Sequence, residues 1–505
     1  MVPGHVPVRS PITMTPRLRG RWLAVAAAVL IVAAAVLVLR GTAGGGRAGT
    51  APADQVVVAK TTRTNVIVIL TDDQRWDTLW SMPNVQKLLV KHGVTFQNSF
   101  VSDSLCCPSR ASILTGNYAH TTGVYDNHPP FGGAPAFKQH GDDRSTIATW
   151  LHADGYDTGL FGKYLNSYAG GVPPGWDRWV AFDYEPAYYP YYVFSNAPGA
   201  CKRKPACRLP QTVAAYSTTY FGDATTRFID TAPANKPVFA YYAPYAPHLP
   251  SFPQHRYANR FAHLPQYRPP SFNEADVSDK PPWIRALHRF DPVQTDQIYA
   301  QRQAEYQTLV TVDNEVGKIV ASLRATHRLA HSVILFASDN GISWGEHRLT
   351  VSSKQVPYDE ALRVPLVVRY EPATTKPATD RHLIVNIDWA PTLAAIAGAK
   401  HPPVEGRSFL PFLQGKTPTP PWRSEFLLEH MEGNPPGLTP AFCGIRSTRY
   451  MYTRYTGGYQ ELYDLKTDPY ELQNIASQPA QAGEVAHMRA LVARECKPPP
   501  PGYKP

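Results

Sequence analysis

Acidic residues are absent from the first fifty positions of this 505-residue chain, whereas six arginines fall there. These arginines supply more than half of the formal net charge of +10, so the rest of the chain is only mildly basic. The sequence also lacks a long run of Lys and Arg interleaved with aromatic residues, a common mark of nucleic-acid-binding segments. We therefore expect no nucleic-acid partner.

Charged residues are sparse at 18%, but hydrophobic residues reach 43%. This balance excludes a disordered or fibrous chain, and the length allows a large core with one big catalytic domain and an appendage, or two to three smaller domains. Fifty prolines and 11% aromatic residues predict many loops, with rings available to line a cleft. Such a composition suits an active site built from loops.

One uncharged apolar run, WLAVAAAVLIVAAAVLVL, covers residues 22–39 and is long enough to cross a bilayer core. Arginines precede it and the flexible GTAGGGRAGTAPA follows it. We expect an exported protein, in which this run is either a membrane anchor with the catalytic domain outside the cell or a cleaved signal peptide that leaves a secreted enzyme. We favour the anchor, with residues 1–21 as a basic cytoplasmic tail and residues 40–60 as a flexible linker.

Cysteine is also scarce, with six residues in all. Export would place them in an oxidising compartment and make disulfides possible. Cys201 and Cys207 bracket the loop CKRKPAC, and Cys443 and Cys496 span the C-terminal region. The sequence does not fix the connectivity, but pairing within each of these two sets is one arrangement, worth about 2 and about 4 kcal/mol respectively in the loop-entropy model.

That arrangement leaves Cys106 and Cys107 over. Adjacent cysteines rarely bridge one another, because a disulfide needs its two α-carbons farther apart than one peptide unit allows. Pro108 can occupy the first turn of a helix with the sequence SRASILTG, closed by Gly116. Cys106 would then lie just before a helix N-terminus, where free N–H groups favour an anion, and Arg110 adds a planar donor. Such a cysteine is either structural or a thiolate nucleophile.

Alternating strand and helix patterns predict an α/β domain over residues 61–414. Continuous apolar runs indicate buried strands at residues 64–70, 236–250 and 331–337. Helix-like segments occupy residues 82–93, 145–156, 218–232 and 304–327. We expect a large, mainly parallel sheet sandwiched by helices. Beyond about residue 415, shorter alternating segments predict a C-terminal α+β subdomain over 415–505, with a small antiparallel sheet and a helix near 481–494.

Polar side chains follow the predicted strands. Asp72 and Asp73 end the first strand, the pair Asp339-Asn340 ends another, and His248 follows a third. Functional groups gather beyond the carboxyl ends of strands in such sheets, so these residues could converge. The oxygen ligands of the two pairs suit calcium or magnesium rather than zinc. Either pair alone could equally be a helix cap or a turn.

The stretch CCPSRASILTG resembles the sulfatase signature Cys-x-Pro-Ser-Arg followed by Leu-Thr-Gly, and GYDTGLFGKYLN resembles the second sulfatase signature. The resemblance extends over roughly residues 60 to 480 and includes APHLP, SSKQVPYDEALRVPLVVR and LYDLKTDPYELQNIA. It implies an alkaline-phosphatase-like fold and the conversion of Cys106 to formylglycine (3-oxoalanine) by a formylglycine-generating enzyme. Cys107 would occupy only the variable position, and we expect it to be buried.

The resemblance also implies a mechanism. One hydroxyl of the hydrated aldehyde attacks sulfur and releases the alcohol, and the second expels the enzyme-bound sulfate. Lys163 and Lys354 would clamp the sulfate oxygens. Arg110 would stabilise the hydrate, and His248 would sit by the leaving oxygen. The ligands of the cation, calcium or alternatively magnesium, would be Asp72, Asp73, Asp339, Asn340 and the converted Cys106.

Four further residues qualify this picture. His120 lies one helix turn past the first signature and is either a substrate-binding histidine or a cap or packing residue, whereas Glu346 and His347 are more typical of loop structure than of ligands. Leu165 stands where many sulfatases have histidine, which leaves open the group that assists deprotonation. The GKYLN form resembles the N-acetylglucosamine-6-sulfatase and heparan 6-O-endosulfatase branch. It favours a sulfated sugar as substrate, with an aryl sulfate as the alternative.

Three other functions compete with a sulfatase. A phosphate or phosphonate ester hydrolase of the same superfamily could use the same lysine clamp. A non-catalytic protein that binds sulfated glycans would be expected to lack the cysteine or a metal carboxylate, and neither is missing. A lipoteichoic-type phosphoglycerol transferase fits less well, because only one apolar span precedes the domain and the nucleophile there is threonine.

Overall fold

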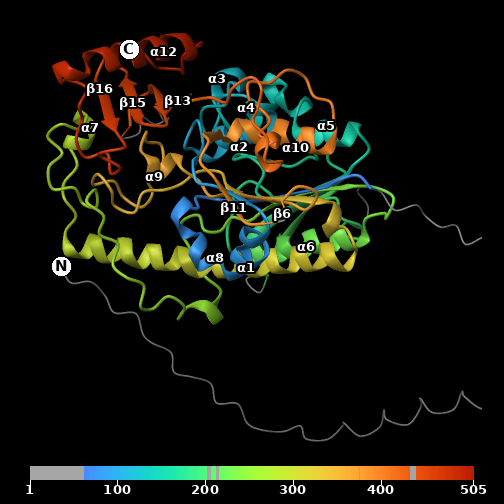
Figure 1. The fold of residues 1–505 in the computed structure, drawn as a ribbon. Coiled ribbons are helices and arrows are strands. Elements are labelled where there is room, and N and C mark those ends of the chain that lie inside the picture. Colours follow the sequence, from blue (N-terminus) through green and yellow to red (C-terminus); the bar gives the residue numbers. More distant parts are fainter. Residues whose placement is uncertain (1–61, 202–205, 212–214, 375, 433–438) are drawn as a thin grey trace, which may run out of the picture. The chain divides into compact units, whose positions relative to one another are not determined.

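A buried parallel strand, β1 (Asn65–Thr71), lies at the centre of the fold in the computed structural model, which describes residues 62–201, 206–211, 215–374, 376–432 and 439–505 (Figure 1). The other strands are β2 (Val94–Phe96), β3 (Ser99–Phe100), β4 (Asp157–Gly162), β5 (Arg178–Phe182), β6 (Tyr191–Ser195), β7 (Cys207–Gln211), β8 (Val238–Ala243), β9 (Ser332–Ser338), β10 (Leu366–Tyr370), β11 (Ala378–Asp380), β12 (Ile384–Val385), β13 (Glu425–His430), β14 (Phe442–Ser447), β15 (Tyr450–Tyr455) and β16 (Gln460–Asp464).

The helices are α1 (Pro83–Leu88), α2 (Cys106–Thr115), α3 (Ala119–Thr122), α4 (Gly133–His140), α5 (Ile147–Ala153), α6 (Ser217–Thr231), α7 (Pro282–Arg285), α8 (Pro292–Ala325), α9 (Asp359–Leu362), α10 (Trp389–Ala397), α11 (Leu410–Leu413) and α12 (Ala482–Glu495). Short 3-10 helices are η1 (Trp76–Ser81), η2 (Val90–His92), η3 (Asp142–Arg144), η4 (His255–Tyr257), η5 (Leu329–His331), η6 (Asn386–Asp388) and η7 (Pro479–Gln481).

Within the described ranges, ten strands form one sheet in the order β11-β2-β10-β9-β1-β8-β4-β5-β6-β7. The five strands from β9 to β5 pair in parallel, whereas β10 and β6 are antiparallel to their neighbours. The expectation of a mainly parallel sheet is confirmed. The parallel core matters for function, because it sends the carboxyl ends of β1, β9, β8 and β4 to one edge.

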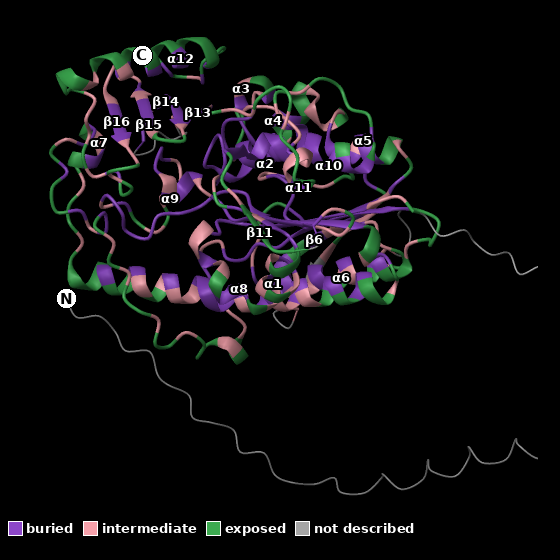
Figure 2. Cartoon of the chain, viewed as in Figure 1, coloured by how far each residue is buried: buried purple, intermediate pink, exposed green. Residues whose placement is uncertain are grey.

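Side chains of β1 alternate between two hydrophobic clusters, one on each face of the sheet. Val66, Val68 and Leu70 join one cluster, and Ile67 and Ile69 join the other. This alternation explains why the strand reads as a continuous apolar run, since both faces are covered. Helices α1, α6 and α8 cover one face and α2, α5 and α10 the other (Figure 1), and the purple interior between these layers is buried (Figure 2).

A second, antiparallel sheet follows the large one in sequence, with the strand order β13-β14-β15-β16. Helix α12 contacts β14 and β15, and its Val485, Met488 and Leu491 pack with Ile445 of that sheet. The small antiparallel sheet with a terminal helix is thus confirmed, and the helix begins one residue later than expected. The division between domains at residue 415 stays a prediction.

Some elements differ from the sequence-based expectations. Helix α8 was expected from residue 304 but begins at Pro292. Asp291 and Gln294 form a reciprocal capping box at this start. Helix α2 begins at Cys106 itself rather than after it. Both differences arise at helix N-termini, and at α8 the polar cap rather than apolar periodicity sets the boundary.

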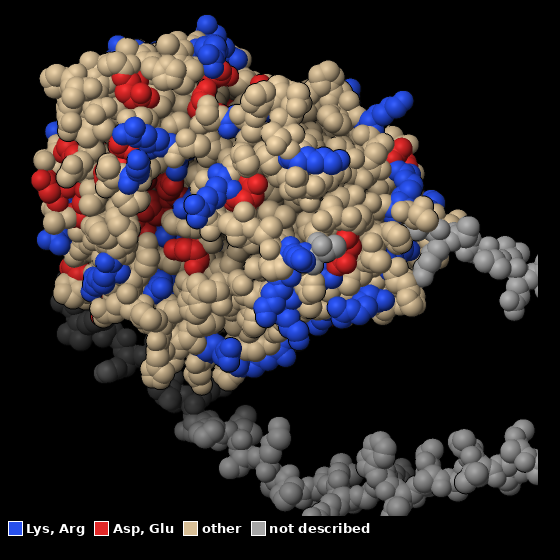
Figure 3. Space-filling model, viewed as in Figure 1, with Lys and Arg blue, Asp and Glu red and all other residues tan. Residues whose placement is uncertain are grey.

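Two disulfides, Cys201–Cys207 and Cys443–Cys496, are present, while Cys106 and Cys107 are free and buried. The pairing considered from the sequence is confirmed. No helix in the described part of the chain is both long enough and apolar enough to cross a bilayer. The tail 1–21, the apolar run 22–39 and the linker 40–60 lie outside the described residues. On the face drawn in Figure 3, positive and negative side chains are interspersed among uncharged ones.

Candidate active site

The register of β1 and β9 brings the two predicted acidic pairs together. Thr71 and Ser338 are the last paired residues of the two strands, so Asp72 and Asp339 leave the sheet side by side. The backbone N–H of Asp73 donates to Asp339 Oδ1 over 3.0 Å. The amide of Asn340 donates to Asp73 Oδ1 over 2.7 Å. Four side chains from distant parts of the chain thus share one buried location.

This cluster has the donors that a hard cation requires. Asn340 Oδ1 is buried and has no hydrogen-bond partner in the described part of the chain. Ligand atoms of Asp72, Asp73, Cys106 and His248 lie within 4.8 Å of one another. Carboxylate and amide oxygens that face a buried space suit calcium or magnesium, so the residues present fit such an ion. A buried amide oxygen without a partner is otherwise costly.

Helix α2 carries Cys106 to this cluster. The Cys107 N–H donates to Asn127 Oδ1 over 2.9 Å. The helix is capped at its C-terminus by Gly116, whose φ of 77° lies in the left-handed region that glycine adopts most readily. Cys106 Sγ lies 3.5 Å from Asp72 Oδ1. Asn127 could not be identified from the sequence, because a loop asparagine in the stretch YDNHPP carries no signal beyond that of a turn.

Arg110 lies one turn along α2 and is buried. Its Nε donates to Asp339 Oδ2 over 2.7 Å, and its Nη1 donates to the Lys163 carbonyl over 2.9 Å. Nη2 is 3.7 Å from Asp72 Oδ2 and has no hydrogen-bond partner in the described ranges. Arg110 therefore braces the carboxylates and keeps one free donor at the site.

Two lysines from different segments of the chain contact the carboxylates. Lys163, just after β4, donates from Nζ to Asp72 Oδ2 over 2.6 Å. Lys354 Nζ lies 2.7 and 2.9 Å from the two oxygens of Asp73 and 3.0 Å from Cys106 Sγ. Burial would lower the pKa of each lysine, but the neighbouring aspartate raises both pKa values. Both side chains are therefore ammonium groups near residue 106.

Electrostatics also separate the two strand-end aspartates of β1 and β9. Burial would raise the pKa of Asp72, but Lys163, His248 and Arg110 hold that pKa well below its usual range. Burial together with the charge of Asp72 raises the pKa of Asp339 to about 7. The site thus combines three carboxyl groups with three fixed cations in a small buried volume, an arrangement typical of a functional site.

His248 follows β8 and stacks on Tyr245 with ring centroids 4.6 Å apart. Its Nδ1 is 2.5 Å from the Leu249 carbonyl, which can only accept, so Nδ1 carries the proton. Nε2 lies 3.3 Å from Lys354 Nζ and 3.5 Å from Asp73 Oδ2. Burial lowers the pKa of His248, which makes the imidazole neutral at neutral pH.

The Cys106 thiol is fully buried, and this burial raises its pKa to about 12 despite the nearby Lys163 and Lys354. The pKa of Cys107 rises to about 12 for the same reason. An unmodified thiol at either position is therefore protonated at neutral pH, whereas a nucleophilic cysteine needs a lowered pKa.

His120, on α3, contacts carboxylates with both ring nitrogens. Nδ1 is 3.0 Å from Glu429 Oε2, and Nε2 is 3.0 Å from Glu405 Oε1. Burial would lower the pKa of His120, but the hydrogen bonds to these two carboxylates raise it to about 10. Both ring nitrogens are thus engaged with carboxylates, which favours the packing alternative, and the role of His120 in substrate binding stays a prediction.

Leu165 is 3% exposed and belongs to a hydrophobic cluster of the large domain. The place of the missing histidine is therefore apolar. Lys354 Nζ contacts Cys106 Sγ, and a ligand atom of His248 lies within 4.8 Å of that sulfur.

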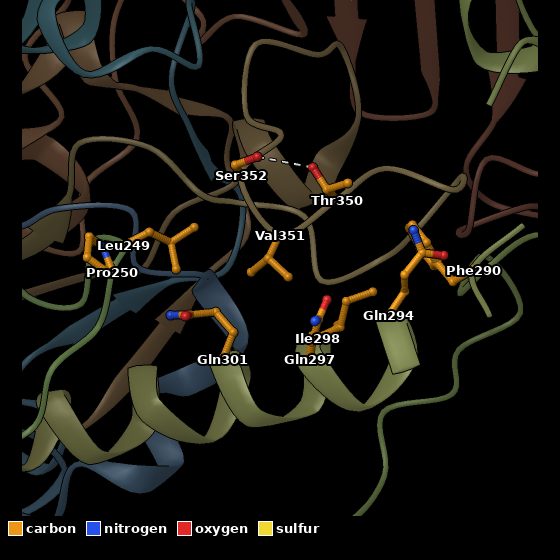
Figure 4. Close-up of a pocket in the computed structure, with 10 residues that line it drawn as sticks. All are labelled: Leu249, Pro250, Phe290, Gln294, Gln297, Ile298, Gln301, Thr350, Val351 and Ser352. Carbon is orange, nitrogen blue, oxygen red and sulfur yellow. Dashed lines mark hydrogen bonds between the residues drawn. The ribbon is translucent and has the colours of Figure 1, made fainter. Parts of the chain in front are cut away.

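A pocket of about 520 Å³ lies between α8 and the loop that carries Lys354. In Figure 4, Gln294, Gln297 and Gln301 project from α8, Val351 lies opposite the helix, and Leu249 and Pro250 lie at one end of the pocket. Two of the residues that line the pocket are close in sequence to residues of the site. Leu249 follows His248, and Ser352 precedes Lys354 by two positions. Its lining is uncharged. This pocket could not be identified from the sequence, since its lining residues become neighbours only through folding.

Comparisons with known proteins agree with this geometry. Residues 64–399 match the family model Sulfatase, and residues 345–497 match the model N-sulphoglucosamine sulphohydrolase, C-terminal. The N-acetylglucosamine-6-sulfatase of Homo sapiens is 30% identical over 508 residues, which cover 89% of each chain. An extracellular sulfatase Sulf-1 homolog of Caenorhabditis elegans is 32% identical over 389 residues, and this chain spans about half (52%) of that protein.

Similarity to solved structures extends over most of the chain. A protein solved in complex with its substrate D-glucosamine-2-N,6-O-disulfate superimposes with a TM-score of 0.75 at 22% identity. The match covers 86% of this chain and 98% of that one, so the two share a fold. The chain belongs to the sulfatase family and is a sulfuric ester hydrolase.

Proposed function

We propose that this enzyme hydrolyses sulfate esters of sugars, with residue 106 acting as formylglycine and a calcium ion held by the acidic cluster. Magnesium is the alternative ion. The observation that carries the proposal is the convergence of Asp72, Asp339 and Lys354 on Cys106 in a buried site. The 30% identity to N-acetylglucosamine-6-sulfatase over most of both chains supports a sulfated amino sugar as the substrate class.

The pocket beside the site supports a sugar rather than a flat aromatic group. Three glutamine side chains on one face of α8 offer amide donors and acceptors, and Leu249 and Val351 offer apolar surface. Sugar rings present hydroxyls at their edges and C–H groups on their faces, so mixed amide and apolar linings fit them. A pocket of about 520 Å³ also lies within the usual size of small-ligand sites.

Each basic side chain has a task in this proposal. Lys163 and Lys354 would bind the sulfate oxygens, on which negative charge increases as the S–O bond breaks. Arg110 would donate its free Nη2 hydrogen to an oxygen on residue 106. Removing one such donor from a catalytic oxyanion site typically costs about 3 to 4 kcal/mol of transition-state stabilisation.

Lys354 and His248 together hold a proton close to residue 106. His248 Nε2 accepts from the Lys354 ammonium over 3.3 Å, while its Nδ1 is fixed by the Leu249 carbonyl. We infer that this pair gives a proton to the leaving alcohol oxygen and regains it from water. This proton transfer serves the leaving group and is separate from the deprotonation of residue 106, for which Leu165 offers no group.

Two groups complete the proposed site. A hydrated aldehyde at residue 106 supplies the nucleophilic hydroxyl and, from its second hydroxyl, the means of releasing sulfate. Asp72, Asp73, Asp339 and Asn340, together with the converted Cys106, would hold a calcium ion, which would supply polarisation of a sulfate oxygen. A formylglycine-generating enzyme would be the maturation partner.

The location of the protein is part of the same proposal. Two disulfides support export, and a relative is described as extracellular. We propose that residues 22–39 anchor the chain in the cell membrane behind a cytoplasmic tail of residues 1–21, with the catalytic domain outside. A cleaved signal that leaves a secreted enzyme is the alternative. The linker of residues 40–60, the catalytic domain of residues 61–414 and the C-terminal subdomain of residues 415–505 complete the proposed organisation.

A substrate panel tests the function. Purified enzyme is incubated with N-acetylglucosamine 6-sulfate, an aryl sulfate and the matching aryl phosphate, and the released sulfate or phosphate is measured. We expect the sulfated sugar to have the highest kcat/KM and the Cys106→Ala variant to release no sulfate. Preferential turnover of the phosphate would assign the enzyme to the other ester class of the superfamily.

A further inference from the structure

A second group of buried ligating residues lies outside the site around Cys106. His347 comes from the loop after β9, Glu360 from α9, and Glu471 from the segment after β16. One ligand atom of each residue lies within 4.8 Å of the others. The three side chains are therefore neighbours although more than a hundred positions separate Glu360 from Glu471.

Each of the three side chains has a buried polar atom that forms no hydrogen bond in the described part of the chain. These atoms are His347 Nε2, Glu360 Oε2 and Glu471 Oε1. The residues are 0%, 8% and 1% exposed, so bulk water does not satisfy them. Three unpartnered acceptors in one buried place are unusual, because such groups each cost about 1 to 3 kcal/mol.

The histidine is oriented as a metal ligand would be. Its Nδ1 is 2.7 Å from Glu274 Oε2, so Nδ1 donates and Nε2 presents a lone pair to the two glutamates. A carboxylate behind a ligating imidazole is the common arrangement in metal sites. The ring also stacks on Tyr358 at a centroid distance of 4.2 Å, which fixes its plane.

The charge of the two glutamates favours a cation beside them. Nearby carboxylates have partners: Arg75 pairs with Glu346 over 2.7 Å, and Arg446 pairs with Asp359 over 3.0 Å. Neither Glu360 nor Glu471 forms an ion pair within the described ranges. A divalent ion beside a neutral imidazole and two carboxylates makes the group neutral.

We propose that His347, Glu360 and Glu471 bind a second divalent cation, a transition-metal ion of the zinc class. One nitrogen and two carboxylate oxygens suit such an ion, whereas calcium prefers oxygen ligands alone. His347 and Glu360 flank the segment that carries Lys354, and Glu471 belongs to the C-terminal region. The bound ion thus fastens both ends of the Lys354 loop to the region that follows the small sheet.

Metal content tests this proposal on the full-length protein. The Asp339→Asn substitution weakens metal binding at the site around residue 106. A transition metal that stays bound to this variant therefore reports on the site formed by His347, Glu360 and Glu471. After incubation with Zn²⁺ and removal of free ion, we expect about one zinc per chain in Asp339→Asn and none in Asp339→Asn/His347→Gln. His382→Gln is the matched control, because His382 also contacts a carboxylate, Asp380, but at an exposed position. This control should keep the zinc.

Cobalt substitution gives a second readout that does not depend on the yield of one variant. Co²⁺ bound to one histidine and two glutamates should give visible d–d absorption in the Asp339→Asn protein. Glu274→Gln, which leaves the ligands in place, should weaken Co²⁺ binding about 10- to 100-fold. Absence of bound Zn²⁺ and of the Co²⁺ spectrum in folded Asp339→Asn protein, or equal binding with and without His347, would overturn the proposal.

Discussion

The Lys354 ammonium nitrogen lies 3.0 Å from the Cys106 sulfur, although the two residues are 248 positions apart. The same nitrogen contacts both oxygens of Asp73 and lies 3.3 Å from His248 Nε2. One lysine therefore touches the residue proposed as nucleophile, a proposed metal ligand and the histidine proposed to serve the leaving group.

Replacement of Lys354 should reduce catalysis more than binding. Lys354→Met removes a cation that faces the sulfate in the transition state, so we expect kcat to fall about 10²- to 10³-fold. The exposed Lys416 gives the control, and Lys416→Met should behave like the native enzyme. Steady-state kinetics with an aryl sulfate measure both. A native kcat in Lys354→Met would exclude this lysine from the chemistry.

The pocket on α8 predicts a separation between two substrate types. Gln297 lines that pocket and is exposed, so Gln297→Leu should remove one hydrogen bond to a sugar, worth about 1 kcal/mol or about five-fold in kcat/KM. Turnover of a small aryl sulfate should not change. Gln303 lies on the same helix outside the pocket lining, and Gln303→Leu is the control. Equal losses on both substrates would argue against a sugar subsite there.

The contacts of His120 with Glu405 and Glu429 predict that the stability of the protein depends on pH. The folded-state pKa of His120, about 10, lies above the usual value near 6.5, because Glu405 and Glu429 favour the charged ring despite burial. Its contribution is therefore complete below about pH 6.5 and is lost as the pH rises through 10. His120→Gln should lower the free energy of unfolding by about 2 kcal/mol at pH 6.

The difference between native and variant protein should shrink toward pH 10. Urea unfolding at several pH values measures it, with the exposed His382→Gln as control. A difference that is constant from pH 6 to pH 10 would show that the ring is not charged in the folded protein.

The Cys443–Cys496 disulfide should contribute more stability than the Cys201–Cys207 disulfide. The first links residues 53 positions apart and ties the end of α12 to β14, whereas the second closes a separation of 6. We expect the Cys443→Ala/Cys496→Ala protein to lose about 4 kcal/mol and the Cys201→Ala/Cys207→Ala protein about 2 kcal/mol. Denaturant midpoints compare the two. Equal losses would contradict the chain-entropy explanation.

The central strands could be predicted from sequence because both of their faces are buried. A continuous, mainly apolar run of seven residues, such as residues 331–337, has the length of a buried strand and is too short for a typical helix. Strands β5, β6 and β7, at the end of the sheet that terminates in β7, were not predicted, since each has only five residues and gives no long apolar run. The first turns of α8 were missed for a different reason: Val293 is 65% exposed there and the helix start depends on the Asp291 cap.

The strand-end residues of the site were predictable because parallel strands bring their carboxyl ends to one edge. Lys163 and Lys354 came only from the resemblance, since single lysines carry no pattern of their own. The pocket on α8 and the group formed by His347, Glu360 and Glu471 could not be found from sequence. Their members share no spacing, and only the folded chain makes them neighbours.

Mass spectrometry of the tryptic peptide 92–110, prepared from active enzyme, tests the central claim most directly. That claim is that an aldehyde at residue 106 is the nucleophile. We predict an aldehyde or its hydrate at position 106 and an intact thiol at Cys107, with activity proportional to the converted fraction and lost in Cys106→Ala. Full activity in protein whose peptide carries intact thiols at both positions would contradict the account.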